Sequence, residues 1–485
     1  MNVNEIIENI EFKVIKGTLD RKVHAIVFDS RQVTEDDLFV AVVGTQTDGH
    51  QFIEKAIKQG AKTVVCEKIP NNMPADITFL QTADSLAALS LLAANFYGNP
   101  SKEMKVTGIT GTNGKTTIAT LLYQLFERAG YKVGLLSTVE NYIHKKVLPS
   151  THTTPDPVQI QSLMRQMVDA GCDYCFMEVS SHAIKQKRIM GIDFNGGVFT
   201  NITHDHLDYH KTFKDYLYTK KAFFDSLQEH AFALINSDDI NGKIMVQNCK
   251  AKVFSFSLQL PADFHAKILQ TDFIATHVIL NNRELWVKLI GRFNIANLLA
   301  IYGTAILLGT SEDEALLYVS ELNPVKGRME TILLEKNKTV IIDYAHTPDA
   351  LKNILEVLND IETEGRNIIT VFGAGGNRDK TKRPEMGAVA SKLSDKIIVT
   401  SDNPRDEDPK QIIEEILEGI PVKRQKDVLT ISDRRSAIKT ALMIANDNDI
   451  ILIAGKGHEN YQEIKGVKSY FSDREVVMEI VNNKP

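Results

Sequence analysis

The clearest chemistry in this sequence lies in residues 106–117, VTGITGTNGKTT. Gly111 and Gly114 allow the backbone to curl so that its N–H groups face inward. An apolar-periodic helix over 118–129 adds the unpaired N–H groups and the positive dipole end of its first turn. Lys115 can reach the outer phosphates of a nucleotide, and the hydroxyl of Thr116 can bind Mg²⁺. The pattern therefore predicts a phosphate-binding loop.

This loop departs from the general G-x-x-x-x-G-K-[ST] pattern at one position, because Ile109 stands where the pattern has glycine. Its core, G-T-N-G-K-T-T, is longer than the general pattern. A β-prone run over 104–109 precedes it and a helix follows it, which is the context that a phosphate loop requires. A chance glycine-rich turn is the alternative, and this context argues against it.

A carboxylate follows the next buried strand. In residues 172–179, CDYCFMEV, the apolar run YCFM leads into Glu178, and Ser180 and Ser181 come directly after this stretch. A phosphate-loop protein needs an acid beside its metal ion at the carboxyl end of such a strand. Two serines are also typical of a helix start, and both interpretations can hold for different residues.

Residues 204–210, HDHLDYH, contain three histidines and two aspartates. Zinc is one interpretation, but a Mg²⁺–nucleotide enzyme prefers oxygen ligands and needs only one or two from the protein. We therefore favour a functional polar cluster over a zinc site.

Lys220 and Lys221 follow on a predicted helix over 213–227, where adjacent lysines are typical of a solvated face. Asn294 begins another predicted helix and can cap it.

Strands and helices alternate along the chain, which predicts α/β domains with mostly parallel sheets. The first 98 residues form a small α/β unit, and residues 99–101, NPS, form a linker. Four predicted strands after residue 328 end in polar turns at 343–346, 373–379, 402–405 and 455–459. The carboxyl ends of parallel strands meet at one edge, so these turns predict a ligand site.

The composition sets limits on the class of protein. A length of 485 residues fits about three domains, and a net charge of −6 without a basic stripe does not support nucleic-acid binding. We expect no membrane span and no signal peptide, and hence a cytoplasmic protein. Cys172 and Cys175 form a lone C-x-x-C, which we interpret as buried structural thiols rather than a redox or zinc site.

Together, these motifs resemble those of the Mur ligase family over essentially the whole chain. The motifs are TGTNGKTT, THTTPDP, EVSSHA, NITHDHLDYH, the helix with Lys220, GRFNIANLLA, GRME, DYAHTPD, GAGGNRDKTKRP, DNPR and AGKGHE. The chain is most similar to the branch that adds the third residue of the peptidoglycan stem peptide. The phosphate loop alone would also fit the related folylpolyglutamate synthetases.

The resemblance implies an α/β protein of three domains: residues 1–98 for the UDP end of the substrate, a central P-loop ATPase-type domain with a parallel sheet over 99–328, and a Rossmann-like α/β domain over 329–485 for the incoming amino acid. It implies that a carboxylate of UDP-MurNAc-L-Ala-D-Glu attacks the γ-phosphate of ATP, with Mg²⁺ as cofactor. The resulting acyl phosphate is then displaced by an amine. A monomer is expected.

The resemblance also assigns residues to roles. The catalytic residues would be Lys115, Glu178, His210 and Lys220, with Lys220 carboxylated, and the Mg²⁺ ligands Thr116, Glu178 and His210. ATP would be bound by Gly111, Thr112, Asn113, Gly114, Lys115, Thr116, Thr117, Asn294 and Asp343. The UDP-muramoyl dipeptide would be bound by Phe28, Ser30, Thr45, Gln46, Thr47, Thr153, Thr154, Ser180, Gln186 and Arg188. The amino acid would be bound by Arg378, Asp402, Asn403, Pro404, Arg405, Gly455 and Glu459.

Enzymes of this branch add either meso-diaminopimelate or L-lysine, which differ by one carboxylate at the far end. An arginine fork can grip that carboxylate with two hydrogen bonds. The turn Asp402-Asn403-Pro404-Arg405 resembles the diaminopimelate type, with Arg405 as the fork, so meso-diaminopimelate is the expected substrate. The alternatives are a folylpolyglutamate synthetase, another Mur step, or an inactive nucleotide-binding module that acts as a switch.

Overall fold

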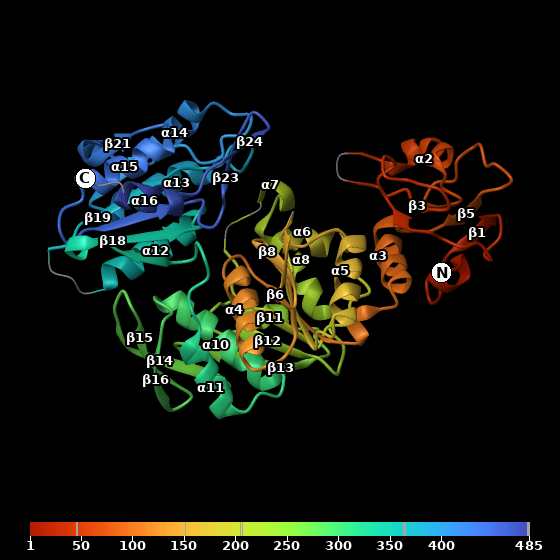
Figure 1. The fold of residues 1–485 in the computed structure, drawn as a ribbon, viewed down its shortest axis with the longest axis horizontal. Helices are drawn as coiled ribbons and strands as arrows, with labels where there is room; N and C mark the ends of the chain where they lie inside the picture. Colours follow the sequence, from red (N-terminus) through yellow and green to blue (C-terminus); the bar gives the residue numbers. More distant parts are fainter. Residues whose placement is uncertain (45–46, 151, 204, 206, 362–364, 483–485) are drawn as a thin grey trace.

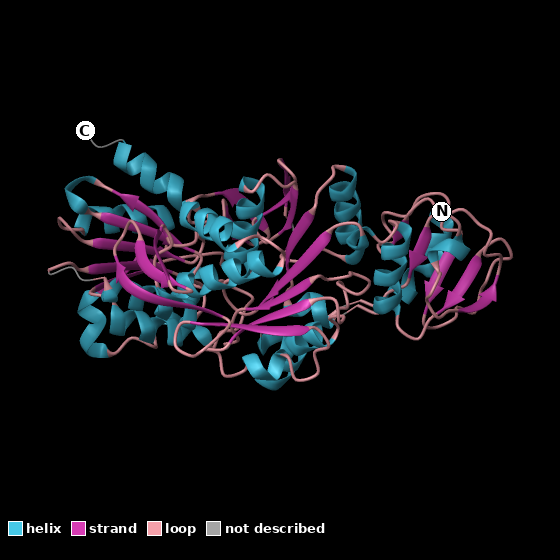
Figure 2. Ribbon diagram, turned by 90° about the horizontal axis from the view of Figure 1, so that it is seen from below, coloured by secondary structure: helices cyan, strands magenta, loops and turns pink. Residues whose placement is uncertain are grey.

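The computed structural model describes residues 1–44, 47–150, 152–203, 205, 207–361 and 365–482. Three β-sheets with helices packed on them come from three consecutive stretches of the chain. Figure 1 shows the N-terminal and C-terminal stretches on opposite sides of the central one, and the turned view shows the same row (Figure 2). The predicted three-domain α/β architecture is confirmed. The domain boundaries at residues 98 and 328 stay predictions.

The first sheet has the strand order β1-β5-β4-β3-β2 and is parallel except for β1. Its elements are α1 (Val3–Ile6), β1 (Lys13–Lys16), β2 (Ile26–Val27), β3 (Leu38–Val40), η1 (Gly49–Phe52), α2 (Ile53–Gln59), β4 (Thr63–Cys66), β5 (Thr78–Gln81) and α3 (Ser85–Phe96). The residues of the predicted linker at 99–101 contribute to a short 3-10 turn, η2 (Pro100–Lys102), in which Pro100 and Ser101 are buried.

The central sheet has the order β16-β15-β14-β13-β12-β11-β6-β10-β7-β8-β9. Its first elements are β6 (Lys105–Thr110), α4 (Lys115–Arg128), β7 (Val133–Leu136), β8 (Glu140–Ile143), β9 (Lys146–Pro149), α5 (Pro157–Asp169), β10 (Tyr174–Glu178), α6 (Ser181–Lys185) and β11 (Gly196–Phe199). Then follow α7 (Leu207–His210), α8 (Phe213–Asp225), β12 (Phe232–Asn236), α9 (Gly242–Met245), β13 (Lys252–Ser257), β14 (Phe264–Thr271), β15 (Thr276–Leu280), β16 (Arg283–Val287), α10 (Arg292–Leu307) and α11 (Glu312–Glu321).

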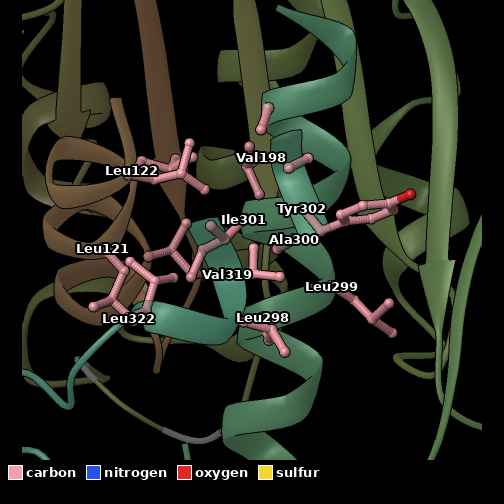
Figure 3. Packing of buried hydrophobic residues seen from close by; sticks show 14 of the residues in the cluster. Leu121, Leu122, Val198, Leu298, Leu299, Ala300, Ile301, Tyr302, Val319 and Leu322 are labelled. Carbon is pink, nitrogen blue, oxygen red and sulfur yellow. The ribbon is translucent and has the colours of Figure 1, made fainter. Parts of the chain in front are cut away.

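The helices α4 and α10 pack together on one face of this central sheet. Leu121 and Leu122 of α4, Leu298 and Ile301 of α10, and Val198 of β11 belong to one buried cluster (Figure 3). A buried aliphatic side chain contributes about 1.5–3 kcal/mol. This packing fixes the start of α4, and therefore the phosphate loop, against the sheet.

The third sheet has the order β17-β18-β22-β19-β20-β21 and is parallel except for β17. Its elements are β17 (Glu330–Leu333), η3 (Glu335–Asn337), β18 (Thr339–Asp343), α12 (Pro348–Asp360), β19 (Ile368–Phe372), α13 (Lys382–Leu393), β20 (Lys396–Val399), α14 (Pro409–Leu417), η4 (Val422–Asp427), β21 (Val428–Thr430), α15 (Arg434–Ile444), β22 (Ile450–Ala454) and α16 (Asp473–Asn482). A separate hairpin joins β23 (Tyr461–Ile464) to β24 (Val467–Tyr470).

Candidate active site

The predicted phosphate loop lies between β6 and α4, and neighbouring residues enclose it tightly. A Cβ atom at Gly111 would lie 1.8 Å from Thr200 Oγ1, and one at Gly114, where φ is +89°, would lie 2.5 Å from Asn297 Oδ1. The hydroxyl of Thr200 also donates to the carbonyl of Asn113 at 2.6 Å. Only glycine therefore fits at the two positions, and the turn after β11 holds the loop in shape.

The ammonium of Lys115 is folded back over this loop. It donates to the carbonyls of Gly111 and Thr112, both at 2.9 Å. Burial lowers the pKa of Lys115, and the nearby Glu178 carboxylate opposes that shift. The hydroxyl of Thr116 accepts a hydrogen bond of 3.2 Å from the guanidinium of Arg328. Phosphate oxygens bound in this loop would take the place of the two carbonyls at the Lys115 ammonium and of the Arg328 guanidinium at the Thr116 hydroxyl.

Glu178 lies beside the loop because β10 pairs with β6. In that register Glu178 stands opposite Ile109. Its Oε1 accepts from the backbone N–H of Thr138 at 2.7 Å, whereas its Oε2 is buried and has no hydrogen-bond partner among the described residues. A buried, unpartnered carboxylate oxygen costs free energy unless a cation or a water satisfies it. Glu178 therefore suits a metal ion.

Ser180 precedes α6 and His210 ends α7, and the hydrogen bond between His210 and Ser181 brings these two segments together. The hydroxyl of Ser180 accepts from the N–H of Ala183 at 3.2 Å and caps α6, so the helix-start interpretation of the serine pair is confirmed. His210 is buried, its Nε2 lies 2.9 Å from Ser181 Oγ, and burial lowers its pKa. Its predicted metal role would require Nε2 to leave Ser181. His204 and His206 lie outside the described residues.

The interpretation of Lys220 and Lys221 as a solvated face is wrong, since both are buried, at 1% and 3% exposure. Lys221 pairs with Asp225 at 2.6 Å within α8. The ammonium of Lys220 instead donates to the carbonyl of Gly111 at 2.9 Å, directly under the phosphate loop. Burial holds the pKa of Lys220 well below its ordinary value, and the nearby Lys115 lowers it further.

Asn294 does not cap its helix, because α10 begins one turn earlier with Gly291 as its cap. The amide of Asn294 is buried and donates to the carbonyl of Ile290 at 2.9 Å.

Asp343 ends β18, and its Oδ2 accepts from the N–H of Met329 at 2.7 Å. Burial raises the pKa of Asp343 to about 6. Neither Asn294 nor Asp343 is among the described residues that line the cavities below.

A hydrogen-bonded group links the predicted dipeptide-binding residues of the central domain. The hydroxyl of Thr154 donates to the carbonyl of Glu178 at 2.7 Å, and Arg188 donates to the carbonyl of Thr154 at 2.8 Å. Arg188 also donates to the amide oxygen of Gln186 at 2.6 Å. The hydroxyl of Thr138 donates to that of Thr153 at 3.0 Å. The group therefore stands directly beside the candidate metal ligand.

The turns after β19, β20 and β22 meet at one edge of the third sheet, as predicted. Arg405 donates to the carbonyl of Gly376 at 2.8 Å, and its backbone has a φ of +51°. A Cβ at Gly376 would lie 1.9 Å from the carbonyl oxygen of Pro404, and one at Gly455 2.5 Å from Asp402 Oδ2. The two glycines therefore let the three turns touch, which brings the guanidinium of Arg405 to the cavity edge.

Two adjoining cavities between the central and C-terminal domains collect most of these side chains. The first, about 250 Å³, is the loop cavity. It is lined by residues that include Thr112, Asn113, Gly114, Lys115, Thr116, Thr117, Glu178, Arg378, Asp402, Asn403, Arg405, Gly455 and Glu459. The second, about 940 Å³, is the wide cavity, and its lining includes Lys115, Thr153, Thr154, Ser180, Arg188, Lys220, Arg378, Arg405 and Glu459.

The N-terminal candidates lie apart from these two cavities. Phe28 lines a separate cavity of about 520 Å³ formed with residues of α5, such as Gln159 and Gln166. Ser30 is buried and Thr47 is exposed. Thr45 and Gln46 lie outside the described residues.

The sequence reasoning missed three side chains of the site. Arg328 reaches the phosphate loop, Asp349 accepts from the amide of Asn113 at 3.1 Å, and Lys456 lies entirely buried beside Glu459. Each falls in a motif that was quoted, namely GRME, DYAHTPD and AGKGHE. Of the three, only Lys456 closely follows a buried strand, β22, which was an available signal, whereas Arg328 precedes β17 and Asp349 lies at the start of α12. The prediction that Cys172 and Cys175 are buried thiols is confirmed, and burial raises the pKa of both.

Family models match all three parts of the chain. They are described as the Mur ligase family, catalytic domain (residues 22–97), the Mur ligase middle domain (109–305) and the Mur ligase, glutamate ligase domain (327–457). The chain belongs to the Mur ligase family.

Two full-length relatives and one solved structure to which the chain is similar share a single name within this family. The chain is 51% identical over 484 residues to the UDP-N-acetylmuramoyl-L-alanyl-D-glutamate--2,6-diaminopimelate ligase of Phocaeicola vulgatus, and the match covers 100% of both chains. It is 50% identical to the ligase of the same name from Cytophaga hutchinsonii, over 99% of both chains. A solved structure of a ligase of that name superimposes with a TM-score of 0.70, at 31% identity and 99% coverage of both chains.

Proposed function

We propose that this chain is an ATP-dependent ligase that joins meso-diaminopimelate to UDP-MurNAc-L-Ala-D-Glu in peptidoglycan precursor synthesis. The observation that carries the proposal is the wide cavity, in which Lys115 of the phosphate loop shares one space with Arg405 and Glu459 of the C-terminal domain. A ligase must hold an activated carboxyl group and an attacking amine in one enclosure, because their relative position supplies much of the rate.

The terminal carboxylate of the UDP substrate attacks the γ-phosphate of ATP, which gives an acyl phosphate and ADP. The amine of diaminopimelate then adds to the acyl carbon, and phosphate leaves from the tetrahedral intermediate with formation of the amide. The chain contributes positioning and charge neutralisation rather than a covalent intermediate. Lys115 exchanges the carbonyls of Gly111 and Thr112 for phosphate oxygens.

Mg²⁺ would be held by Glu178 and by the hydroxyl of Thr116, with His210 as a further ligand. The unpartnered Oε2 of Glu178 fits such a hard cation. When bound, Mg²⁺ neutralises charge on the phosphates of ATP. Removal of divalent metal with a chelator should abolish phosphate release, and turnover that survives chelation would contradict this part of the proposal.

Lys220 is the candidate for carboxylation. Burial favours its neutral amine, which can add to CO₂ with release of one proton to give a carbamate. That change places an anion under the phosphate loop, where it attracts a metal ion that an ammonium group would repel.

The substrate ends are assigned to separate domains. The UDP-muramoyl dipeptide would contact Thr153, Thr154, Ser180, Gln186 and Arg188, with Phe28, Ser30 and the loop at 45–47 at its far end. Arg405 and Arg378 would bind the distal carboxylate of diaminopimelate, and Glu459 an ammonium group. A site built for a carboxylate rejects lysine, because lysine would leave the arginine fork without an anion.

The test is a paired ligation assay with purified full-length protein. We expect phosphate release from ATP only when UDP-MurNAc-L-Ala-D-Glu and meso-diaminopimelate are both present, and little release when lysine replaces diaminopimelate. Equal use of lysine would overturn the assignment of Arg405. Turnover with a folate and glutamate, or nucleotide binding without any turnover, would overturn the proposed function.

No helix among the described residues is long and apolar enough to cross a bilayer. We propose a cytoplasmic monomer.

A further inference from the structure

Lys456, which follows β22, is fully enclosed at 0% exposure. Its ammonium donates to Asn403 Oδ1 at 2.9 Å and to the carbonyl of Tyr461 at 2.7 Å. It also lies 3.4 Å from Glu459 Oε2 and 3.6 Å from Asp402 Oδ1. Burial of an ammonium is costly unless it is paired and hydrogen-bonded, so these contacts fix the groups around it.

The carboxamide of Asn403 connects this cation to Glu459. Asn403 Oδ1 accepts from Lys456 and from the N–H of Glu463 at 3.0 Å, while its Nδ2 donates to Glu459 Oε2 at 2.8 Å. A carboxamide oxygen has two lone pairs, and both are used here. The orientation of the amide is therefore determined, and its nitrogen must face the carboxylate.

Glu459 presents this carboxylate to both the loop cavity and the wide cavity. Its Oε1 accepts from the hydroxyl of Tyr344 at 3.4 Å, and its Oε2 is held by Asn403 and Lys456. Burial and the neighbouring Asp402 carboxylate raise the pKa of Glu459, whereas Lys456 and Asn403 lower it. The ionised form thus depends on the buried cation.

We propose that Lys456 is a positioning residue for the incoming amino acid: directly and through Asn403, it keeps the Glu459 carboxylate ionised and aimed into the cavity, where Glu459 binds an ammonium group of the diamino acid. This inference rests on the proposed function. It also changes the role of Asn403, which orients Glu459 instead of offering its own oxygen to the substrate.

Charged and titratable groups face Glu459 from every element packed against it. They are Tyr344 after β18, Asp402 after β20, Lys456 and His458 after β22, Tyr461 of β23, Arg434 of α15, and Arg378 and Arg405 along the cavities. Within the described part of the chain, Lys456 is the cation at ion-pair distance from Glu459. Without the charge of Lys456, the carboxylates of Asp402 and Glu459 repel each other with no cation between them. The pKa of Glu459 must therefore rise.

The experiment is a double-mutant cycle of Lys456→Met and Glu459→Gln in the full-length protein. Phosphate release is measured against diaminopimelate concentration, with ATP and UDP-MurNAc-L-Ala-D-Glu saturating. Lys456→Met should raise KM for diaminopimelate at least about tenfold, since hydrogen bonds to charged groups are lost, and should leave KM for ATP within about twofold. The acid limb of kcat/KM for diaminopimelate should move to higher pH. In the Glu459→Gln background, Lys456→Met should add less than about twofold.

An equal increase in KM in both backgrounds would show that Lys456 does not act through Glu459 and would overturn the inference. Unchanged KM and pH profile would overturn it too. If Lys456→Met does not fold, Asn403→Leu removes the link through the carboxamide while the direct contact of Lys456 with Glu459 stays, so a smaller increase in KM is expected, with the same non-additivity toward Glu459→Gln. Lys439→Met, an exposed lysine of α15, is the matched control. Wild-type protein without diaminopimelate-dependent turnover would contradict the proposed function itself, which separates the two failures.

Discussion

The side-chain amide of Asn113, in the phosphate loop, donates a hydrogen bond of 3.1 Å to Asp349 Oδ2, 236 residues further along the chain at the start of α12. The hydroxyl of Thr203 also donates to Asp349 Oδ2, at 3.4 Å. These two contacts join the phosphate loop and the turn after β11 to the C-terminal domain, which carries the residues proposed to bind the incoming amino acid. The two halves of the site are therefore coupled through side chains.

Asp349→Ala should weaken nucleotide binding, because Asn113 loses its partner and the loop loses its anchor on α12. Hydrogen bonds to charged groups contribute about 1.5–3 kcal/mol, so KM for ATP should rise roughly tenfold or more. The measurement is phosphate release at varied ATP. The control is Asn353→Ala, since Asn353 donates to the same carboxylate at 3.3 Å but from within α12. If both variants change KM for ATP equally, the link between the domains has no special role.

Arg405→Ala should remove diaminopimelate use selectively. Loss of one partner of a charge pair in an enclosed site costs about 2–5 kcal/mol, which corresponds to a fall in kcat/KM for diaminopimelate of at least about 30-fold. KM for ATP should stay close to the wild-type value. The paired diaminopimelate and lysine assay measures the change in preference.

Lys410→Ala is the control for Arg405→Ala, because Lys410 is an exposed cation on the neighbouring α14. Unchanged diaminopimelate kinetics in Arg405→Ala would remove Arg405 from the site. The hydrogen bond from Arg405 to Gly376 would then have a purely structural purpose.

Lys220→Ala should abolish most turnover if a carbamate at this position supports the metal ion. Adding a short carboxylic acid such as acetate should restore part of the activity, because the small anion can occupy the space left under the phosphate loop. The adjacent Lys221→Met is the control, as Lys221 is also buried but pairs with Asp225. Its variant should lose stability without any response to acetate. A response of equal size in both variants would contradict a specific role for Lys220.

The parts that the sequence predicted well are those governed by local chemistry. The phosphate loop, the strand that ends at Glu178 and the polar turns after parallel strands follow from glycine placement and apolar runs, and the structure has all of them. Lys220 shows the limit, since a lysine pair on a helix is typical of a solvated face, and only the packing of α8 under the loop buries it. Lys456 was missed for the same reason, because its partner Asn403 lies in the turn after β20 and only the folded sheet brings the two side chains together.

Asp343 should make stability depend on pH. Its pKa is raised by burial to about 6 from an ordinary value of 3.8, so the folded state holds the proton more tightly than the unfolded state does. The ionised carboxyl group therefore reduces the free energy of unfolding as pH rises from about 4 to about 6, and the full loss, about 3 kcal/mol, is present above that range. Asp343→Asn keeps an oxygen for the N–H of Met329 but cannot ionise.

We therefore expect Asp343→Asn to raise Tm relative to the wild type at pH 8 and to raise it much less at pH 4.5. The measurement is thermal unfolding without nucleotide across this range, where all other groups are shared by the two proteins and cancel in the difference. Asp360→Asn, at an exposed carboxyl group at the end of α12, is the control, and its Tm difference should vary with pH much less than that of Asp343→Asn. A constant Tm difference for Asp343→Asn would mean that Asp343 is ionised in the folded protein at all these pH values, with Arg328 sufficient to hold its charge.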